Sequence, residues 1–132
     1  MKKRFWLGSI SCFLMICMLA VPALARYQAI NSFTAEYLKD GSTAYCGSAV
    51  DVRTGYDYEL VFTLQRSTNG GSSYSDYHTF PTIYGTGTDR TQSYEESLSG
   101  ISNRYIYRTK VELTIVDSSG DEIESDYCYS TY

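Results

Sequence analysis

The residues of this chain that could do acid–base chemistry are few, and the only histidine is His78. Asp76 lies two residues before it, and in a strand that spacing would place both side chains on one face. Such an Asp–His pair could serve a small hydrolase, but a catalytic triad also needs a nucleophile and an oxyanion hole, for which no motif is visible. We therefore expect no enzymatic activity, with hydrolysis through Asp76 and His78 as an alternative.

The chain contains four cysteines. Cys12 and Cys17 lie in an apolar N-terminal segment, whereas Cys46 and Cys128 lie in the remainder of the chain. In an oxidising compartment an even number of cysteines usually forms bridges, so we predict a Cys46–Cys128 disulfide. A reactive thiol is the alternative, but no CxxC spacing accompanies it. With one histidine and two bridged cysteines no zinc site is expected, and neither a metal nor another cofactor is predicted.

Carboxylates gather in two short stretches. Glu95 and Glu96 are adjacent, so in a strand they point to opposite faces and do not form the facing pair that a glycosidase needs. Residues 117–122 crowd acidic side chains around a turn that contains Ser118, Ser119 and Gly120. Calcium prefers oxygen ligands of this kind, but the spacing is not that of an EF-hand. We expect a solvated acidic turn, with weak calcium binding as the alternative.

The first 25 residues have the three parts of a secretory signal peptide. Three basic residues at positions 2–4 precede an apolar run over 5–21, and Ala23 and Ala25 supply the small residues before a cleavage site. The run is shorter than the ~20 apolar residues of a spanning helix and is interrupted by glycine and serine. We predict cleavage after Ala25, secretion to the extracellular space and no stable membrane anchor.

Cleavage would change the charge of the protein. The whole chain has 11 basic and 15 acidic residues, and the signal removes three basic ones, so residues 26–132 carry a net charge of −7. Such a chain repels phosphate backbones and anionic lipids, so no nucleic-acid partner is expected. The same charge disfavours a membrane-active toxin. A secreted toxin or bacteriocin-like factor stays as the alternative function.

Tyrosine is unusually abundant, with 14 residues in the chain. Many fit half-buried strand positions, but several lie in polar, turn-rich stretches with Ser, Gly and Asn. That composition resembles antibody recognition loops, in which tyrosine supplies rigid contact area, and the same rings can stack on sugars. The partner we expect is therefore an extracellular protein or a cell-surface glycan. The candidate binding residues are Tyr74, Tyr77, Tyr84 and Tyr94, and Tyr129 and Tyr132 share their setting.

The elements that would position these side chains read as strands. Residues 56–65 and 105–116 alternate apolar and polar side chains with a period of two, which predicts the two central strands. Weaker strands are expected at 32–38, 43–52, 74–80, 88–98 and 121–129, with 74–80 and 88–98 as edges. Seven strands separated by glycine-containing turns predict one all-β domain over residues 26–132. The expected fold is an antiparallel β-sandwich of immunoglobulin or fibronectin type, and a small β-barrel is the alternative.

The position of Cys128 in the alternating pattern of the last strand conflicts with a disulfide in the core. Cys128 alternates out of step with Ile123 and Tyr127, so we expect the disulfide on the outer side of the last strand or after a bulge.

The order of motifs resembles a group of small, poorly characterised secreted proteins of Gram-positive bacteria, many of them gut Firmicutes. Besides the signal peptide and a Gly/Ser hairpin, the motifs are Phe62-Thr63-Leu64-Gln65-Arg66, Tyr105-Ile106-Tyr107-Arg108-Thr109-Lys110-Val111, Ser119-Gly120 and Glu122-Ile123-Glu124. The resemblance implies a single β-sandwich domain and supplies no site. Many of those proteins have tryptophan in the hairpin where this chain has Tyr74. The sequence therefore predicts a secreted, non-catalytic binding protein.

Overall fold

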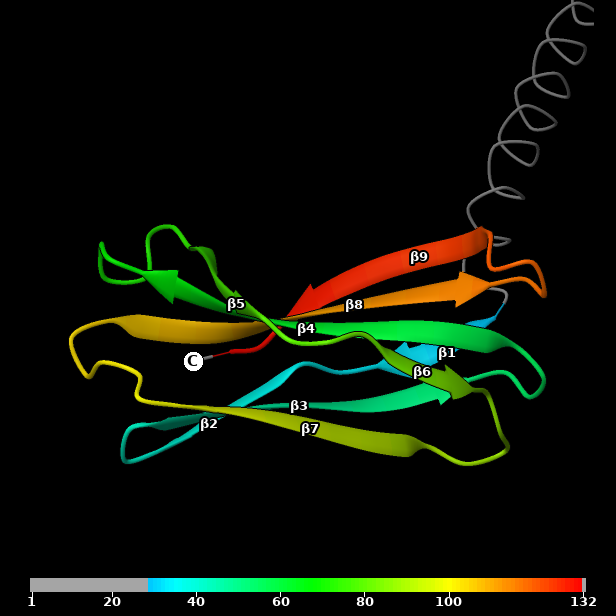
Figure 1. Ribbon diagram of the computed structural model, residues 1–132, viewed down its shortest axis with the longest axis horizontal. Coiled ribbons are helices and arrows are strands. Elements are labelled where there is room, and N and C mark those ends of the chain that lie inside the picture. Colours follow the sequence, from blue (N-terminus) through cyan, green and yellow to red (C-terminus); the bar gives the residue numbers. More distant parts are fainter. Residues whose placement is uncertain (1–28, 132) are drawn as a thin grey trace, which may run out of the picture.

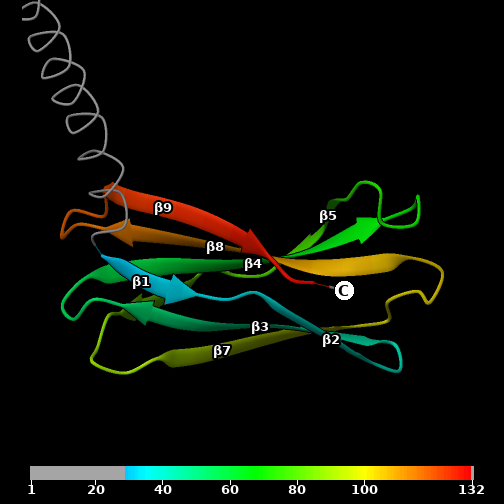
Figure 2. The same ribbon diagram turned by 180° about the vertical axis from the view of Figure 1, so that it is seen from behind.

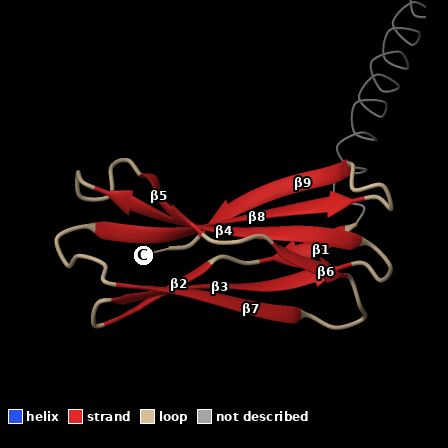
Figure 3. Cartoon of the chain, in the orientation of Figure 1, coloured by secondary structure: helices blue, strands red, loops and turns tan. Residues whose placement is uncertain are grey.

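The computed structural model describes residues 29–131, and this part consists of strands, turns and loops (Figure 3). No helix in it is long and apolar enough to cross a membrane. The predicted signal peptide, with Cys12 and Cys17, lies outside the described residues. The strands are β1 (Ile30–Phe33), β2 (Glu36–Asp40), β3 (Thr43–Val52), β4 (Asp57–Ser67), β5 (Ser75–Thr79), β6 (Ile83–Thr86), β7 (Gln92–Ser99), β8 (Ile106–Val116) and β9 (Glu122–Tyr129).

The strands form two antiparallel sheets that pack face to face (Figures 1 and 2). In the first sheet, β3 pairs with β1 and β2 along one edge and with β7 along the other. In the second sheet, β4 pairs with β5 and β6 on one side and with β8 on the other, and β9 completes the order. The prediction of an all-β chain with packed antiparallel sheets is confirmed. The barrel alternative is wrong, because no described strand pairs across the two sheets.

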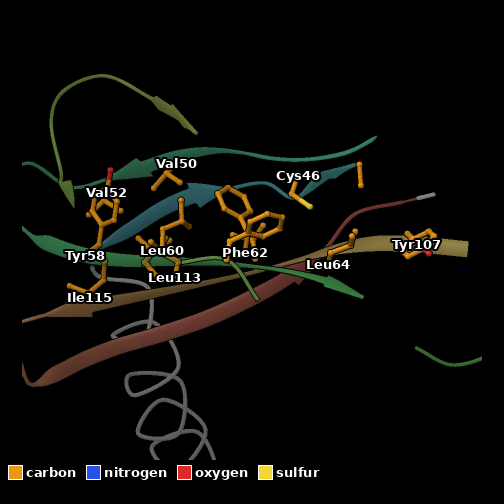
Figure 4. Close-up of a cluster of buried hydrophobic side chains, with 14 of the residues drawn as sticks. Cys46, Val50, Val52, Tyr58, Leu60, Phe62, Leu64, Tyr107, Leu113 and Ile115 are labelled. Carbon is orange, nitrogen blue, oxygen red and sulfur yellow. The ribbon is translucent and has the colours of Figure 1, made fainter. Parts of the chain in front are cut away.

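The core lies between the inner faces of the sheets. β4 and β8 pair without interruption from Asp57 opposite Val116 to Ser67 opposite Ile106, as expected for the two central strands. Burial alternates along the whole of β8 and along β4 up to Phe62, because every second side chain faces the other sheet, whereas Phe62 to Gln65 are all buried. The inward side chains include Tyr58, Leu60, Phe62, Leu64, Leu113 and Ile115, which meet Cys46, Val50 and Val52 of β3 (Figure 4).

Two parts of the strand prediction need correction. The single strand expected at 32–38 is divided into β1 and β2, and Thr34 lies at the break. Its Oγ1 accepts a hydrogen bond from the N–H of Ala49, so this side chain takes the place of a ladder partner. The second correction is β6, which lies between the predicted strands 74–80 and 88–98, where no strand was expected. A Cβ on Gly85 would lie 2.5 Å from the Tyr58 ring, so this glycine serves close packing in a strand.

The predicted Cys46–Cys128 disulfide is absent from the structure, and both thiols are free. Cys46 is fully buried on β3, a central strand of the first sheet, whereas Cys128 lies on β9, the edge strand of the second. Cys128 is opposite Val111, a core residue, so its side chain faces the interior, and the expectation of an outer position is wrong. A disulfide would have to connect β3 and β9 across the core, with the Cα atoms of the two cysteines within about 7 Å of each other.

The loops gather at the two ends of the long axis of the sandwich, which are the left and right sides of Figure 1. At one end the N–H of Ile101 donates to the carbonyl of Ser42, so the loop after β7 lies against the β2–β3 turn. At the other end the N–H of Gly87 donates to the carbonyl of Tyr56. There the N–H of Ala29 also donates to the buried Glu124 carboxylate at 3.1 Å, which fixes the start of the described chain against β9.

Candidate functional site

The four tyrosines predicted to bind a ligand are not brought together by the fold. Tyr94 faces the core from β7, and its hydroxyl is hydrogen-bonded to that of Tyr58, so it is structural. Tyr84 lies on β6 with three quarters of its side chain exposed (75%). Tyr74 and Tyr77 lie at the other end of the second sheet, before and within β5. The predicted set therefore separates into one partly buried tyrosine that packs against the core, one isolated exposed tyrosine and a neighbouring pair.

The Asp–His pair considered in the sequence does not form. A register shift between Leu64 and Gln65 places Asp76 opposite Gln65, whose side chain points outward, and His78 opposite Leu64, which points into the core. Asp76 accepts a hydrogen bond from the Gln65 amide at 2.8 Å. His78 packs edge-on against Phe80, with 4.6 Å between ring centroids. The bulge thus turns the two side chains to opposite faces, which overturns the expectation that they share one.

The acidic turn is organised by its own backbone. The Oδ1 atom of Asp117 accepts hydrogen bonds from the N–H groups of Ser119 and Asp121, at 2.8 and 2.9 Å. Within residues 29–131 no group of three or more His, Cys, Asp or Glu side chains is arranged to hold a metal ion. The turn therefore uses Asp117 as a cap, and calcium binding gains no support from this geometry.

The first aromatic cluster is centred on Arg66, at the end of β4. The guanidinium lies over the rings of Tyr77 and Tyr105, at 4.7 and 4.6 Å from their centroids. Tyr77 also contacts Tyr107 edge to face, with 5.8 Å between centroids. Arg66 is opposite Tyr107, a buried residue, so this cluster lies on the inward-facing side of the second sheet, at its end. Stacking on the two rings fixes the position of the Arg66 guanidinium, and its positive charge can still interact with a ligand.

The second cluster is centred on Arg108 and lies on the outer face of the same sheet. Its guanidinium is stacked between Tyr74 and Tyr129, at 4.0 and 3.8 Å from the ring centroids. Its Nε donates a 2.8 Å hydrogen bond to Gln65 Oε1, which orients the plane. No carboxylate within hydrogen-bonding range of Arg108 is found among the described residues, so its charge is balanced by aromatic faces and an amide.

Two neighbours extend this second cluster along β8 and β9. Tyr127 packs edge-on against Tyr129 with an interplanar angle of 72°, and Lys110 lies 5.4 Å from the Tyr127 ring centroid. Lys110 also forms a 3.1 Å ion pair with Glu112, which raises the pKa of its ammonium group. Tyr127 and Tyr129 remain 56% and 42% exposed. We call this set the outer-face cluster: Tyr74, Arg108, Lys110, Tyr127 and Tyr129.

Sequence reasoning identified Tyr74 and Tyr129 but missed the arginine between them. Arg108 lies among the outward positions of a central strand, where it reads as an ordinary solvated charge. Its stacking depends on register, because Arg108 of β8 is opposite Gln65 of β4 while Tyr129 of β9 is opposite Lys110 of β8. The sequence signal that could have indicated Arg108 is the period-two alternation of side chains, which places Arg108 and Lys110 on one face of β8.

No family model matches the chain, and no curated protein matches it in sequence.

Proposed function

We propose that this protein is a secreted, non-catalytic recognition domain that binds an extracellular protein through its outer-face cluster. The observation that carries the proposal is Arg108, fixed between two tyrosine rings and flanked by exposed tyrosines on a rigid sheet. Tyrosine and arginine are the side chains most enriched at the energetic centres of protein interfaces. A pre-stacked arginine loses little conformational freedom on binding, which favours affinity. Secretion rests on the signal-peptide pattern in residues 1–25.

The geometry of the rings favours a protein over a flat polysaccharide surface. Tyr127 and Tyr129 meet at 72°, so they do not form the coplanar platform on which successive sugar rings stack. A protein surface offers carboxylates for Arg108 and irregular apolar features for rings at different angles. A glycan partner is therefore treated as an outcome of the binding test.

We also propose that the fold is of immunoglobulin type. One sheet has β3 between β1–β2 and β7, and the other has the order β5/β6, β4, β8, β9. Assigning β3, β4, β7, β8 and β9 to strands B, C, E, F and G reproduces the pairing of that fold, with the outer-face cluster on the sheet that contains C, F and G. Further support comes from the resemblance to small secreted β-sandwich proteins of Gram-positive bacteria.

The proposal is tested by saturation binding of the fluorescently labelled chain to intact bacterial cells, to cells treated with protease, to cell-wall polysaccharide and to mucus glycoproteins. We compare Tyr127→Ala and Arg108→Gln with Tyr84→Ala. Tyr84 is a matched control because it is an exposed tyrosine outside the cluster. We expect saturable binding that protease treatment removes, weakened about tenfold or more by the first two variants and unchanged by Tyr84→Ala.

Other results would contradict this proposal. Binding that survives protease treatment, or that purified polysaccharide reproduces, would make the partner a glycan. Equal binding by all three variants would exclude the outer-face cluster, and an absence of saturable binding to every surface would remove the recognition function.

A further inference from the structure

One carboxylate of this protein is buried without a complete set of partners. Glu124 of β9 lies opposite Ile115, a core residue, and only 8% of its side chain is exposed. Its Oε2 atom accepts a 3.1 Å hydrogen bond from the N–H of Ala29. Its Oε1 atom is also buried, and no described residue donates a hydrogen bond to it. Because burying a charged oxygen without a partner costs free energy, this atom requires a donor from elsewhere.

The part of the chain that the structure describes supplies no cation to Glu124. Its one ion pair, within residues 29–131, joins Lys110 and Glu112. The strand partner of Glu124 and its hydrogen-bond partner have apolar side chains. Arg53 donates its backbone N–H to the carbonyl of Ala29, but its side chain is exposed. A buried carboxylate is stable as an ion only when a cation pairs with it, so the cation for Glu124 has to come from outside the described residues.

The chain segment that leads into Ala29 carries a cation within reach. Cleavage after Ala25, which the signal-peptide pattern predicts, makes Arg26 the first residue of the chain. Arg26 lies three residues before Ala29, a span of at most about 11 Å in a fully extended chain. Ala29 is fixed at both backbone groups, because its N–H donates to Glu124 and its carbonyl accepts from Arg53. The segment that begins at Arg26 is therefore anchored at the carboxylate itself.

We propose that Arg26 supplies the cation that binds Oε1 of Glu124, so that the new end of the chain that cleavage creates is bound to the sandwich. After cleavage this residue has two positive groups, its α-ammonium and its guanidinium, and both donate charge-assisted hydrogen bonds to carboxylates. With the N–H of Ala29 on one oxygen and the Arg26 cation on the other, both oxygens of Glu124 have partners. The inference rests on the cleavage that the proposed function includes, but not on the outer-face cluster, because Glu124 faces the core.

Binding of the N-terminus has a consequence for a secreted protein. Chain ends are the preferred sites of proteolysis unless contacts with the fold hold them in place. An aminopeptidase needs a free chain end, so residues 26–28 are trimmed only while Arg26 is released from Glu124. The ion pair therefore protects the mature N-terminus against extracellular peptidases.

Aminopeptidase digestion tests this protection. The chain is secreted with its own signal peptide, and its intact mass first establishes whether it begins at Arg26. The loss of residues 26–28 is then followed by mass for wild type, Glu124→Gln and a control, Glu122→Gln, whose side chain is exposed on the same strand. Glutamine can still accept from the N–H of Ala29, so Glu124→Gln removes only the charge. We expect trimming about tenfold faster or more in Glu124→Gln, and at the wild-type rate in Glu122→Gln.

Two results of this experiment would overturn the inference. Equal trimming rates for Glu124→Gln and wild type would show that the carboxylate does not hold the N-terminus. A secreted chain that does not begin at Arg26 would remove the cation from its proposed place, while leaving recognition through the outer-face cluster unaffected.

Thermal unfolding identifies which positive group pairs with Glu124. Arg26→Leu removes the guanidinium and keeps the α-ammonium, whereas a Gly-Ser insertion between Ala25 and Arg26 moves the α-ammonium away and keeps the guanidinium. One of these changes should lower the melting temperature by about 5 °C or more, because it leaves a buried carboxylate unpaired. In the Glu124→Gln background the same change should shift it by less than about 1 °C. Arg53→Leu removes an exposed arginine from the same end and should have no effect.

A different outcome would assign Oε1 to another donor. If neither change lowers the melting temperature, or if the loss is the same in both backgrounds, a buried water satisfies this oxygen and the proposed ion pair does not exist.

Cell binding separates this inference from the proposed function. Glu124→Gln keeps the whole outer-face cluster, so it should bind cells as the wild type does while losing its N-terminal residues faster. Tyr127→Ala should show the reverse, with weakened cell binding and trimming at the wild-type rate.

Discussion

Tyr58 of β4 and Tyr94 of β7 join the two sheets, with their rings at 79° and their hydroxyl oxygens 2.5 Å apart. The side-chain oxygen of Gln92 is within hydrogen-bonding range of both hydroxyls, and the two hydroxyl protons are shared among these three oxygens. Tyr58 is almost fully buried, so this polar network is satisfied inside the sandwich. It links the two sheets across a core that is mostly apolar.

Loss of the Tyr58 hydroxyl should therefore destabilise the protein. In Tyr58→Phe the packing of the ring is kept, but Tyr94 and Gln92 each lose a partner, so the free energy of unfolding should fall by about 1–2 kcal/mol. Urea denaturation measures this change. Tyr84→Phe is the control, because that hydroxyl belongs to a highly exposed side chain, and its stability should be unchanged. Equal stability of Tyr58→Phe and wild type would show that the network contributes nothing.

Stability should also decrease at alkaline pH. Burial and then the hydrogen bond to Tyr94 raise the pKa of Tyr58 above its ordinary value of 10.0. Burial and Asp126 raise the pKa of Cys128 from 9.0 to about 11. Above pH 9 the unfolded state therefore releases protons that the folded state retains, so the free energy of unfolding falls as pH rises toward 11.

This pH dependence can be assigned by substitution. Cys128→Ser should flatten the decrease between pH 9 and 11, and Tyr58→Phe should flatten it above pH 10, each relative to wild type. Thermal unfolding at a series of pH values gives the comparison. A melting temperature that is constant from pH 8 to pH 11 would contradict the assignment of raised pKa values to these groups.

Gly85 is expected to tolerate no side chain. Its Cβ would lie 2.5 Å from the Tyr58 ring, so Gly85→Ala must displace that ring and disturb its hydrogen bonds. We expect a loss of about 1–3 kcal/mol, the usual cost of overpacking. Gly47→Ala is the matched control in β3, where the nearest atom would be 3.6 Å away. Its stability should equal or exceed that of the wild type, and equal effects of the two changes would refute the packing explanation.

The two free thiols should react differently in the folded and unfolded protein. Burial raises the pKa of Cys46, and the side chain is fully enclosed in the core. Because the thiolate is the reactive form, Cys46 should react with a disulfide reagent at pH 8 roughly 100-fold more slowly in the native state than in denaturant. Titration in denaturant should find both Cys46 and Cys128 reduced. Their absence from that titration would mean that the disulfide forms after all.

Some strands of this fold could be predicted from the sequence and others could not, and the difference has a physical reason. β3 was predicted with its observed bounds, because small side chains that fit a buried face recur at every second position, those of Ala44, Cys46, Ser48, Val50 and Val52. The long pair β4 and β8 followed from the same period. β6 was missed, since Gly85 signals a turn unless one knows that the Tyr58 ring lies beside it. The division between β1 and β2 depends on a hydrogen bond from Ala49, which no local pattern encodes.

The candidate site was less predictable because it depends on register. Composition indicated exposed tyrosines, and Tyr74 and Tyr129 do belong to the outer-face cluster. The arginine that joins them was invisible, because residues 74, 108 and 129 come from three segments that only sheet pairing brings together. The contact of Tyr94 with Tyr58 was invisible for the related reason that Tyr58 is in the opposite sheet.

Photocrosslinking from the outer-face cluster tests the central claim most directly. One chain carries Tyr127→p-benzoylphenylalanine and a second carries Tyr84→p-benzoylphenylalanine, and each is irradiated on intact bacterial cells with and without excess wild-type chain. We predict one dominant protein adduct from position 127, suppressed by the wild-type competitor, and none from position 84. An adduct from position 84 alone, or no competable adduct from position 127 on cells that bind the protein, would contradict recognition through the outer-face cluster.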